Sequence, residues 1–333
     1  MTLLSLIIFS FSLNLTALDS PDKIELIING QEAVFDCQWQ RADSIFTELY
    51  RIDSTDPAGY LYRAAALQAE MTDKEEDLHG TRFMALCDSA KTAAKKRLEN
   101  CTRRDSAFCY LYLGHQYAYR SLWESRFRSN FSALKLGMKA KSAYQKGLEV
   151  DSTLYDLYLG PGNYHYWKSV RSGLLRLFGI FKDEREKGIK EIELAADSSL
   201  FSRDAALSAL LWIMIDRKDF DSAIALGGRM LEKYASGNTF SWPLGEALYN
   251  AGRYDGAYQN YRNIWFHLLH NKTGNYYNFI ECAYWLYKSC GELGDKKMMK
   301  EIINEIRQHY EKIPRKTKRR QKRKLNYLLK QDG

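Results

Sequence analysis

Proline is scarce in this chain, with five residues in 333, and long stretches of alternating polar and apolar residues are missing. The scarcity of proline excludes a collagen-like chain, and a hydrophobic content of 45% excludes a disordered one. Without alternating runs there is little from which to build a β-sheet. Because apolar residues recur instead at helical spacing, the sequence predicts an all-α protein.

The sequence also lacks the motifs that carry common catalytic chemistry. It contains no His-Glu-x-x-His, no Gly-x-Ser-x-Gly and no glycine-rich phosphate loop ending in Lys-Ser or Lys-Thr. The histidines are scattered, and His267 and His270 have no carboxylate or cysteine at ligand spacing. We therefore expect no enzymatic activity, no metal, no cofactor and no small-molecule substrate.

The cysteines form no Cys-x-x-Cys pair and show no metal-ligand spacing. Several fall inside helical patterns, where cysteine packs as a small hydrophobic residue. Buried free thiols are therefore the simpler interpretation. If the chain is exported, Cys101 and Cys109 are the pair to test as a disulfide.

The chain begins with an apolar run over residues 3–18, which ends before the first charged residue, Asp19. Its length is typical of a signal-peptide core and falls short of the roughly 20 residues of a membrane span. We expect residues 1–19 to be a signal peptide, with an N-terminal anchor or a first helix of the fold as alternatives. A signal peptide predicts an exported protein, periplasmic or envelope-associated, whereas a helix of the fold would predict a cytoplasmic one.

Helix–turn–helix spacing is clearest in one segment of the chain. Its first part reads Tyr110-x-x-Leu113-Gly114-x-x-Tyr117, and its second part reads Ala140-x-x-x-Tyr144-x-x-Gly147. Where two helices approach most closely only small residues let the backbones meet, and aromatic side chains fill the gaps beside them. The pattern resembles the tetratricopeptide repeat (TPR) family, and weaker copies recur, among them residues 26–57 and 238–272.

The resemblance implies a right-handed α-solenoid of about six or seven TPR-like helix hairpins over residues 20–311. Two segments depart from the repeat pattern. Between residues 120 and 134 either the helices are longer or a loop protrudes. Residues 160–182 contain Tyr164, His165 and Trp167, followed by an apolar stretch at 174–181, and an enzyme or accessory pocket there is an alternative to the repeat.

The resemblance also implies a concave groove, formed by the first helix of each hairpin, in a non-enzymatic scaffold for protein–protein interaction. Carried over at the family's offsets from its Leu-Gly pairs, the groove residues are His115, Tyr119, Tyr164, His165, Trp242, Glu246, Tyr249, Asn250, Tyr284 and Lys288. Aromatic side chains with a few polar anchors suit a protein or peptide segment of a partner. The alternative is that these aromatic residues pack between repeats.

The positive charge of the chain is concentrated at its C-terminus. The net charge is +8, and residues 312–333 hold ten Lys or Arg and one acid, so the rest of the chain is close to neutral. Leucines follow the cations at helical spacing, which predicts a basic capping helix at 312–333. Alternatively the tail binds an anionic membrane surface, or nucleic acid if the chain is not exported, through Lys318, Arg319, Arg320, Lys322, Arg323 and Lys324.

Overall fold

The computed structural model describes residues 17–172, 182–270 and 274–331 of the chain. The expected signal segment at residues 1–19 lies outside the described residues except for its last three positions. The apolar stretch at 174–181 lies outside them as well. Nowhere in the described ranges is a helix both long enough and apolar enough to cross a membrane.

The described part of the chain is helical and contains no β-strand, which confirms the all-α prediction. The helices are α1 (Pro21–Phe35), α2 (Trp39–Ile52), α3 (Pro57–Lys74), α4 (Gly80–Leu98), α5 (Arg103–Phe127), α6 (Asn130–Val150), α7 (Leu159–Arg171), α9 (Arg185–Ser198), α10 (Arg203–Asp216), α11 (Phe220–Lys233), α12 (Asn238–Asn250), α13 (Tyr254–His270), α14 (Tyr276–Leu293), α15 (Lys296–His309), α16 (Arg315–Arg320) and α17 (Lys322–Leu329). Short 3-10 turns precede α7 and follow α15 at Tyr155–Tyr158 and Tyr310–Lys312.

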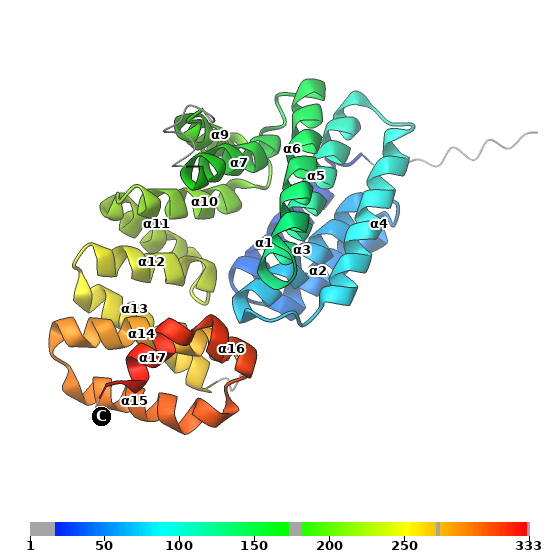
Figure 1. Cartoon of the computed structure of the whole chain (residues 1–333). Helices are drawn as coiled ribbons and strands as arrows, with labels where there is room; N and C mark the ends of the chain where they lie inside the picture. Colours follow the sequence, from blue (N-terminus) through cyan, green and yellow to red (C-terminus); the bar gives the residue numbers. More distant parts are fainter. Residues whose placement is uncertain (1–16, 173–181, 271–273, 332–333) are drawn as a thin grey trace, which may run out of the picture.

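Helices that follow one another along the chain pack against one another from α1 to α15 (Figure 1). Alternate helices also touch, since α3 contacts both α1 and α5, and α10 contacts α12. Packing between neighbours in sequence, with a second set of contacts between alternate helices, is the arrangement of an α-helical repeat.

Glycine–aromatic contacts bring the two helices of a hairpin together. A Cβ atom on Gly114 of α5 would lie 2.5 Å from Cδ1 of Tyr144 on α6, so only glycine leaves room for that ring. Gly160 of α7 approaches the same ring, where a Cβ would lie 2.5 Å from Cζ. The glycines of two successive first helices therefore both contact Tyr144. The equivalent pairs in other hairpins are Gly30 with Phe46 and Gly245 with Tyr261.

The irregular segment at 120–134 consists of extended helices. α5 runs for 25 residues to Phe127, and α6 begins at Asn130 after a turn in which the Ser129 side chain accepts a hydrogen bond from the Ser132 backbone N–H. Such an N-cap satisfies a backbone donor that has no partner inside the helix. The insertion therefore lengthens one hairpin.

The basic tail folds back over the last hairpin. Leu325 and Leu328 of α17 are buried, and α17 packs on α14 and α15. Because these leucines lie three residues apart, they share one face of the helix and direct it onto the core.

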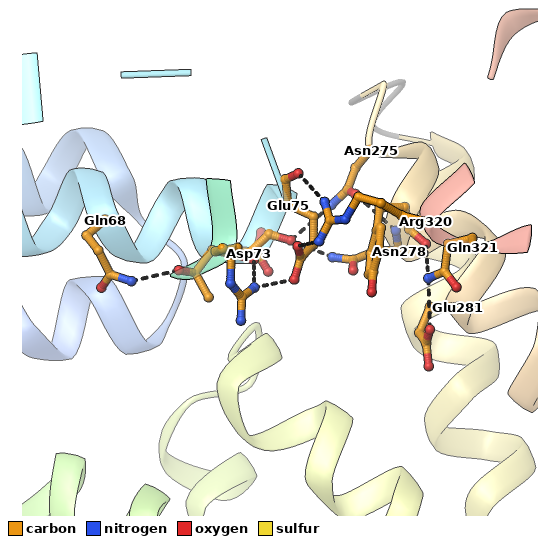
Figure 2. A network of polar contacts seen from close by, with 11 residues as sticks. Gln68, Asp73, Glu75, Asn275, Asn278, Glu281, Arg320 and Gln321 are labelled. Atoms are coloured by element: carbon orange, nitrogen blue, oxygen red, sulfur yellow. Dashed lines mark hydrogen bonds and ion pairs between the residues drawn. The ribbon is translucent and has the colours of Figure 1, made fainter. Parts of the chain in front are cut away.

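The N-terminal and C-terminal helices meet at the turn between α3 and α4 (Figure 2). The backbone carbonyl of Asp73 accepts hydrogen bonds from Asn275 at 3.1 Å and Asn278 at 2.5 Å. Two residues further, just after the end of α3, Glu75 forms an ion pair with Arg320 of α16 at 2.6 Å. Segments about 200 residues apart or more in sequence are thereby joined, and the chain of hairpins closes on itself (Figure 1).

Candidate binding surface on α12 and α14

The expected groove residues of α5 lie in helix–helix packing. His115 is 8% exposed, and its Nδ1 lies 2.7 Å from the hydroxyl of Tyr144 on α6. Burial lowers the pKa of His115 to about 4, so the ring is neutral at physiological pH. Tyr119 packs beside it, with ring centroids 5.8 Å apart. Both residues are occupied by contacts within the hairpin.

The expected residues of α7 divide into one buried and one partly exposed side chain. Nδ1 of His165 lies 2.6 Å from Oε2 of Glu191 on α9, and the histidine is 5% exposed. Tyr164 is half-buried, and its ring centroid lies 4.9 Å from the ammonium of Lys141 and 5.7 Å from that of Lys168. His165 is thus held between two helices by an acid that sequence reasoning did not single out.

The other expected residues come together on one surface. Trp242, Glu246, Tyr249 and Asn250 lie on α12, and Tyr284 and Lys288 lie on α14. Trp285, which sequence reasoning missed, connects the two sets, because its ring centroid lies 5.3 Å from those of both Tyr249 and Tyr284. Apart from Asn250, which is exposed, these side chains are neither fully buried nor fully exposed, so part of each remains accessible. We call this set, with Trp285, the α12–α14 surface.

Ammonium groups lie over the aromatic rings of this surface. Nζ of Lys288 is 5.0 Å from the ring centroid of Tyr249 and 5.7 Å from that of Trp285. Lys324 of α17 also lies over the cluster, with Nζ 5.3 Å from the ring centroid of Tyr284 and 5.6 Å from that of Trp285. Aromatic faces attract cations within about 6 Å. The surface therefore already holds two of the chain's own lysines.

Glu281 anchors the tail to the α12–α14 surface. Its carboxylate accepts hydrogen bonds from Nε1 of Trp285 at 2.9 Å and from Nε2 of Gln321 at 2.9 Å, and it pairs with Lys324. The positions 281, 285 and 288 are spaced by four and three residues, so they share one helix face. The sequence therefore indicated that Glu281 and Trp285 share a face of this helix. It did not indicate that both contact Lys324, because that contact depends on the position of α17.

Glu246, the acid of the α12–α14 surface, has no such anchor among the described residues. Burial raises its pKa, the nearby carboxylate of Glu281 raises it further, and Lys324 partly offsets both effects. Within the described residues its carboxylate accepts no hydrogen bond. Exposed Asn250 lies one turn further along α12 and donates to the backbone carbonyl of Glu246 at 2.9 Å.

The expected anion-binding residues of the tail fall into three groups by their contacts. Arg320 and Lys324 contact the carboxylates of Glu75 and Glu281. Lys318 lies with Nζ 3.8 Å from the ring centroid of Tyr310. The remaining three are exposed, and no ion pair holds them among the described residues: Arg319, Lys322 and Arg323.

Other candidate chemistry is limited in the described part of the chain. No group of three His, Cys, Asp or Glu side chains there is arranged to hold a metal ion. Cys101 and Cys109 are both free thiols, and Sγ of Cys101 lies 3.1 Å from the Ser106 hydroxyl. No protein-family model matches this sequence, and a search of curated proteins finds no match to it.

Proposed function

We propose that this protein is a non-enzymatic interaction scaffold, a right-handed TPR-like solenoid that binds a basic segment of a protein partner on the α12–α14 surface. Support for the TPR assignment comes from the sequential packing of the helices and from the glycine–aromatic contacts at the family's motif positions. The apolar run at residues 3–18 favours a partner in the cell envelope.

One observation carries the choice of a basic partner. The surface combines accessible aromatic faces with the carboxylate of Glu246, and α17 pairs with the neighbouring Glu281 instead. The pKa of Glu246 is raised by burial and by Glu281, and a charge-assisted hydrogen bond from Lys or Arg would stabilise its ionised form. The aromatic rings, over which Lys288 and Lys324 already lie, add apolar contact area. The surface therefore selects a segment with a cation placed among apolar residues.

Site-specific photo-crosslinking in the native cell tests this proposal. A photoreactive amino acid at Asn250 of the tagged, full-length chain is expected to form a discrete adduct with one protein. Mass spectrometry of that adduct should place the crosslink within a Lys- or Arg-containing segment. The same amino acid at Lys300, an exposed position on α15, is the matched control and should give no such adduct.

A charge reversal in the same experiment separates the proposed contact from mere proximity. Glu246→Arg should abolish the Asn250 adduct, because two cations would then oppose each other, while Glu246→Gln should weaken it. The proposal fails if the Asn250 adduct persists in Glu246→Arg, or if Asn250 and Lys300 give the same products.

A further inference from the structure

The end of the α5–α6 hairpin exposes a group of large apolar side chains. Their exposed fractions are 55% for Leu122, 68% for Phe131, 61% for Leu134 and 51% for Met138. Single exposed apolar residues are common on protein surfaces, whereas a cluster of them marks a surface that binds a protein or a membrane. We call these four residues the α5–α6 edge.

The four residues lie on two helices that pack against each other, Leu122 on α5 and the other three on α6. Ser121, next to Leu122, donates a hydrogen bond from its hydroxyl to the backbone carbonyl of Ala133 at 2.7 Å, which ties the last turns of α5 to the first turns of α6. On α6 the positions 131, 134 and 138 are spaced by three and four residues, so they lie on one helix face. This is the lengthened part of the hairpin, which extends beyond the standard repeat.

Lysines accompany the apolar edge. Residues 120–146 contain seven Lys or Arg and one acid, and three of these cations, Arg120, Arg126 and Arg128, are ion-paired with Asp88, Glu75 and Asp77. Lys135 and Lys139 are exposed, and the ammonium of Lys135 lies 4.4 Å from the ring centroid of Phe131. Neither lysine forms an ion pair with any described residue. The edge therefore presents apolar side chains and unneutralised positive charge together.

The basic tail lies beside this edge. Glu75 is held from two directions, by Arg126 of the last turn of α5 and by Arg320 of α16. The tip of the hairpin and the tail thus flank the same turn between α3 and α4. Arg319 directly precedes Arg320 in the sequence and is exposed.

We propose that the α5–α6 edge docks on the surface of an anionic lipid bilayer. A bilayer interface accepts both components of the edge, since apolar side chains enter the boundary of headgroups and acyl chains while lysines meet the lipid phosphates. Nucleic acid would pair with the cations but would leave Leu122, Leu134 and Met138 in water. The charge around the edge is unsuited to a second copy of the same edge, because the two sets of lysines would face each other.

Vesicle flotation of the full-length chain tests the proposal. Vesicles of phosphatidylcholine alone report any binding by residues 3–18, and vesicles with equal parts phosphatidylglycerol report the anionic contribution. We expect the anionic vesicles to bind about tenfold more protein, with a strong decrease at high salt. Phe131→Ser combined with Leu134→Ser should lower that binding about tenfold, and Lys135→Glu combined with Lys139→Glu should do the same.

The control substitution is Leu200→Ser, which changes a leucine of 39% exposure outside the edge and should leave vesicle binding unchanged. Because the edge residues are exposed, their substitutions should also leave the unfolding midpoint unchanged. Equal binding to neutral and anionic vesicles, or wild-type binding by the Phe131 and Leu134 variant, would overturn the proposal. Two further results would overturn it: a wild-type dimer without lipid that the Phe131 and Leu134 variant does not form, or oligonucleotide binding by the wild type that the variant has lost.

Discussion

Replacing Gly114 by alanine tests whether the glycine–aromatic contact holds the hairpins together. The added methyl would lie 2.5 Å from Cδ1 and 2.7 Å from Cζ of Tyr144. The ring cannot retreat, because Gly160 of α7 approaches its other edge, and its hydroxyl is hydrogen-bonded to His115. Overpacking a core costs about 1–3 kcal/mol, and a site without room for relaxation belongs at the upper end.

The intrinsic preference of alanine for a helix opposes this cost by about 1 kcal/mol. Gly114→Ala should therefore lower the free energy of unfolding by about 2 kcal/mol. Gly228 of α11 is the matched control, since no atom lies within 4 Å of its added Cβ, and Gly228→Ala should raise stability by about 0.5–1 kcal/mol. Urea unfolding, monitored by far-UV circular dichroism, measures both changes. The comparison is valid if the dependence of the free energy of unfolding on urea concentration is the same in each variant.

A double-mutant cycle shows whether the ring is the cause. In a Tyr144→Leu background the space next to Gly114 is larger, so Gly114→Ala should become neutral or stabilising, with a coupling of about 2 kcal/mol. Tyr144→Leu alone is expected to be destabilising, because it also removes the partner of His115. If Gly114→Ala behaves like Gly228→Ala, or costs the same in both backgrounds, the packing argument is wrong.

Three further predictions follow from buried polar contacts. The pKa of His115 is lowered from 6.5 to about 4, so between these pH values unfolding takes up a proton and the free energy of unfolding falls as the pH falls. From about pH 7 to about pH 5, urea titrations of His115→Gln should therefore show a decrease in the free energy of unfolding about 2 kcal/mol smaller than that of the wild type. The buried carboxylate of Asp156 accepts three backbone N–H groups at residues 200–202, so Asp156→Ala should cost about 3 kcal/mol or more and abolish hydrogen-exchange protection at those amides. Arg320→Ala removes the ion pair with Glu75, and limited trypsin digestion should then cut the C-terminal tail several times faster while Arg319→Ala leaves the rate nearly unchanged.

The helical architecture was accessible from the sequence because its signals are local. The spacing of Leu113-Gly114 and Tyr144 predicted a small residue facing an aromatic one between two helices, and the structure has that contact. Alternation of helix and turn needs only information within one hairpin. The two possibilities for residues 120–134 could not be separated in this way, because longer helices and a protruding loop both fit an insertion.

The candidate site was accessible only in part. The family offsets placed Tyr249 and Tyr284 among the groove residues, and in the structure both contact the ring of Trp285. The same offsets also selected His115, which is buried against Tyr144, because spacing along a helix does not say how far a neighbouring helix covers it. Glu281 was missed because its significance depends on α17 returning to it.

The amino-acid sequence by itself determined which segments are helical, where small residues let helices approach, and that positive charge gathers at the C-terminus. These are properties of residues within a few turns of one another. The tertiary structure alone decided that Arg320 reaches Glu75, that Lys324 neutralises Glu281 while Glu246 stays without a hydrogen bond, and that four apolar residues of the longest hairpin remain exposed. Each of these depends on the angle at which successive hairpins stack, because small rotations at every interface add up before distant segments meet.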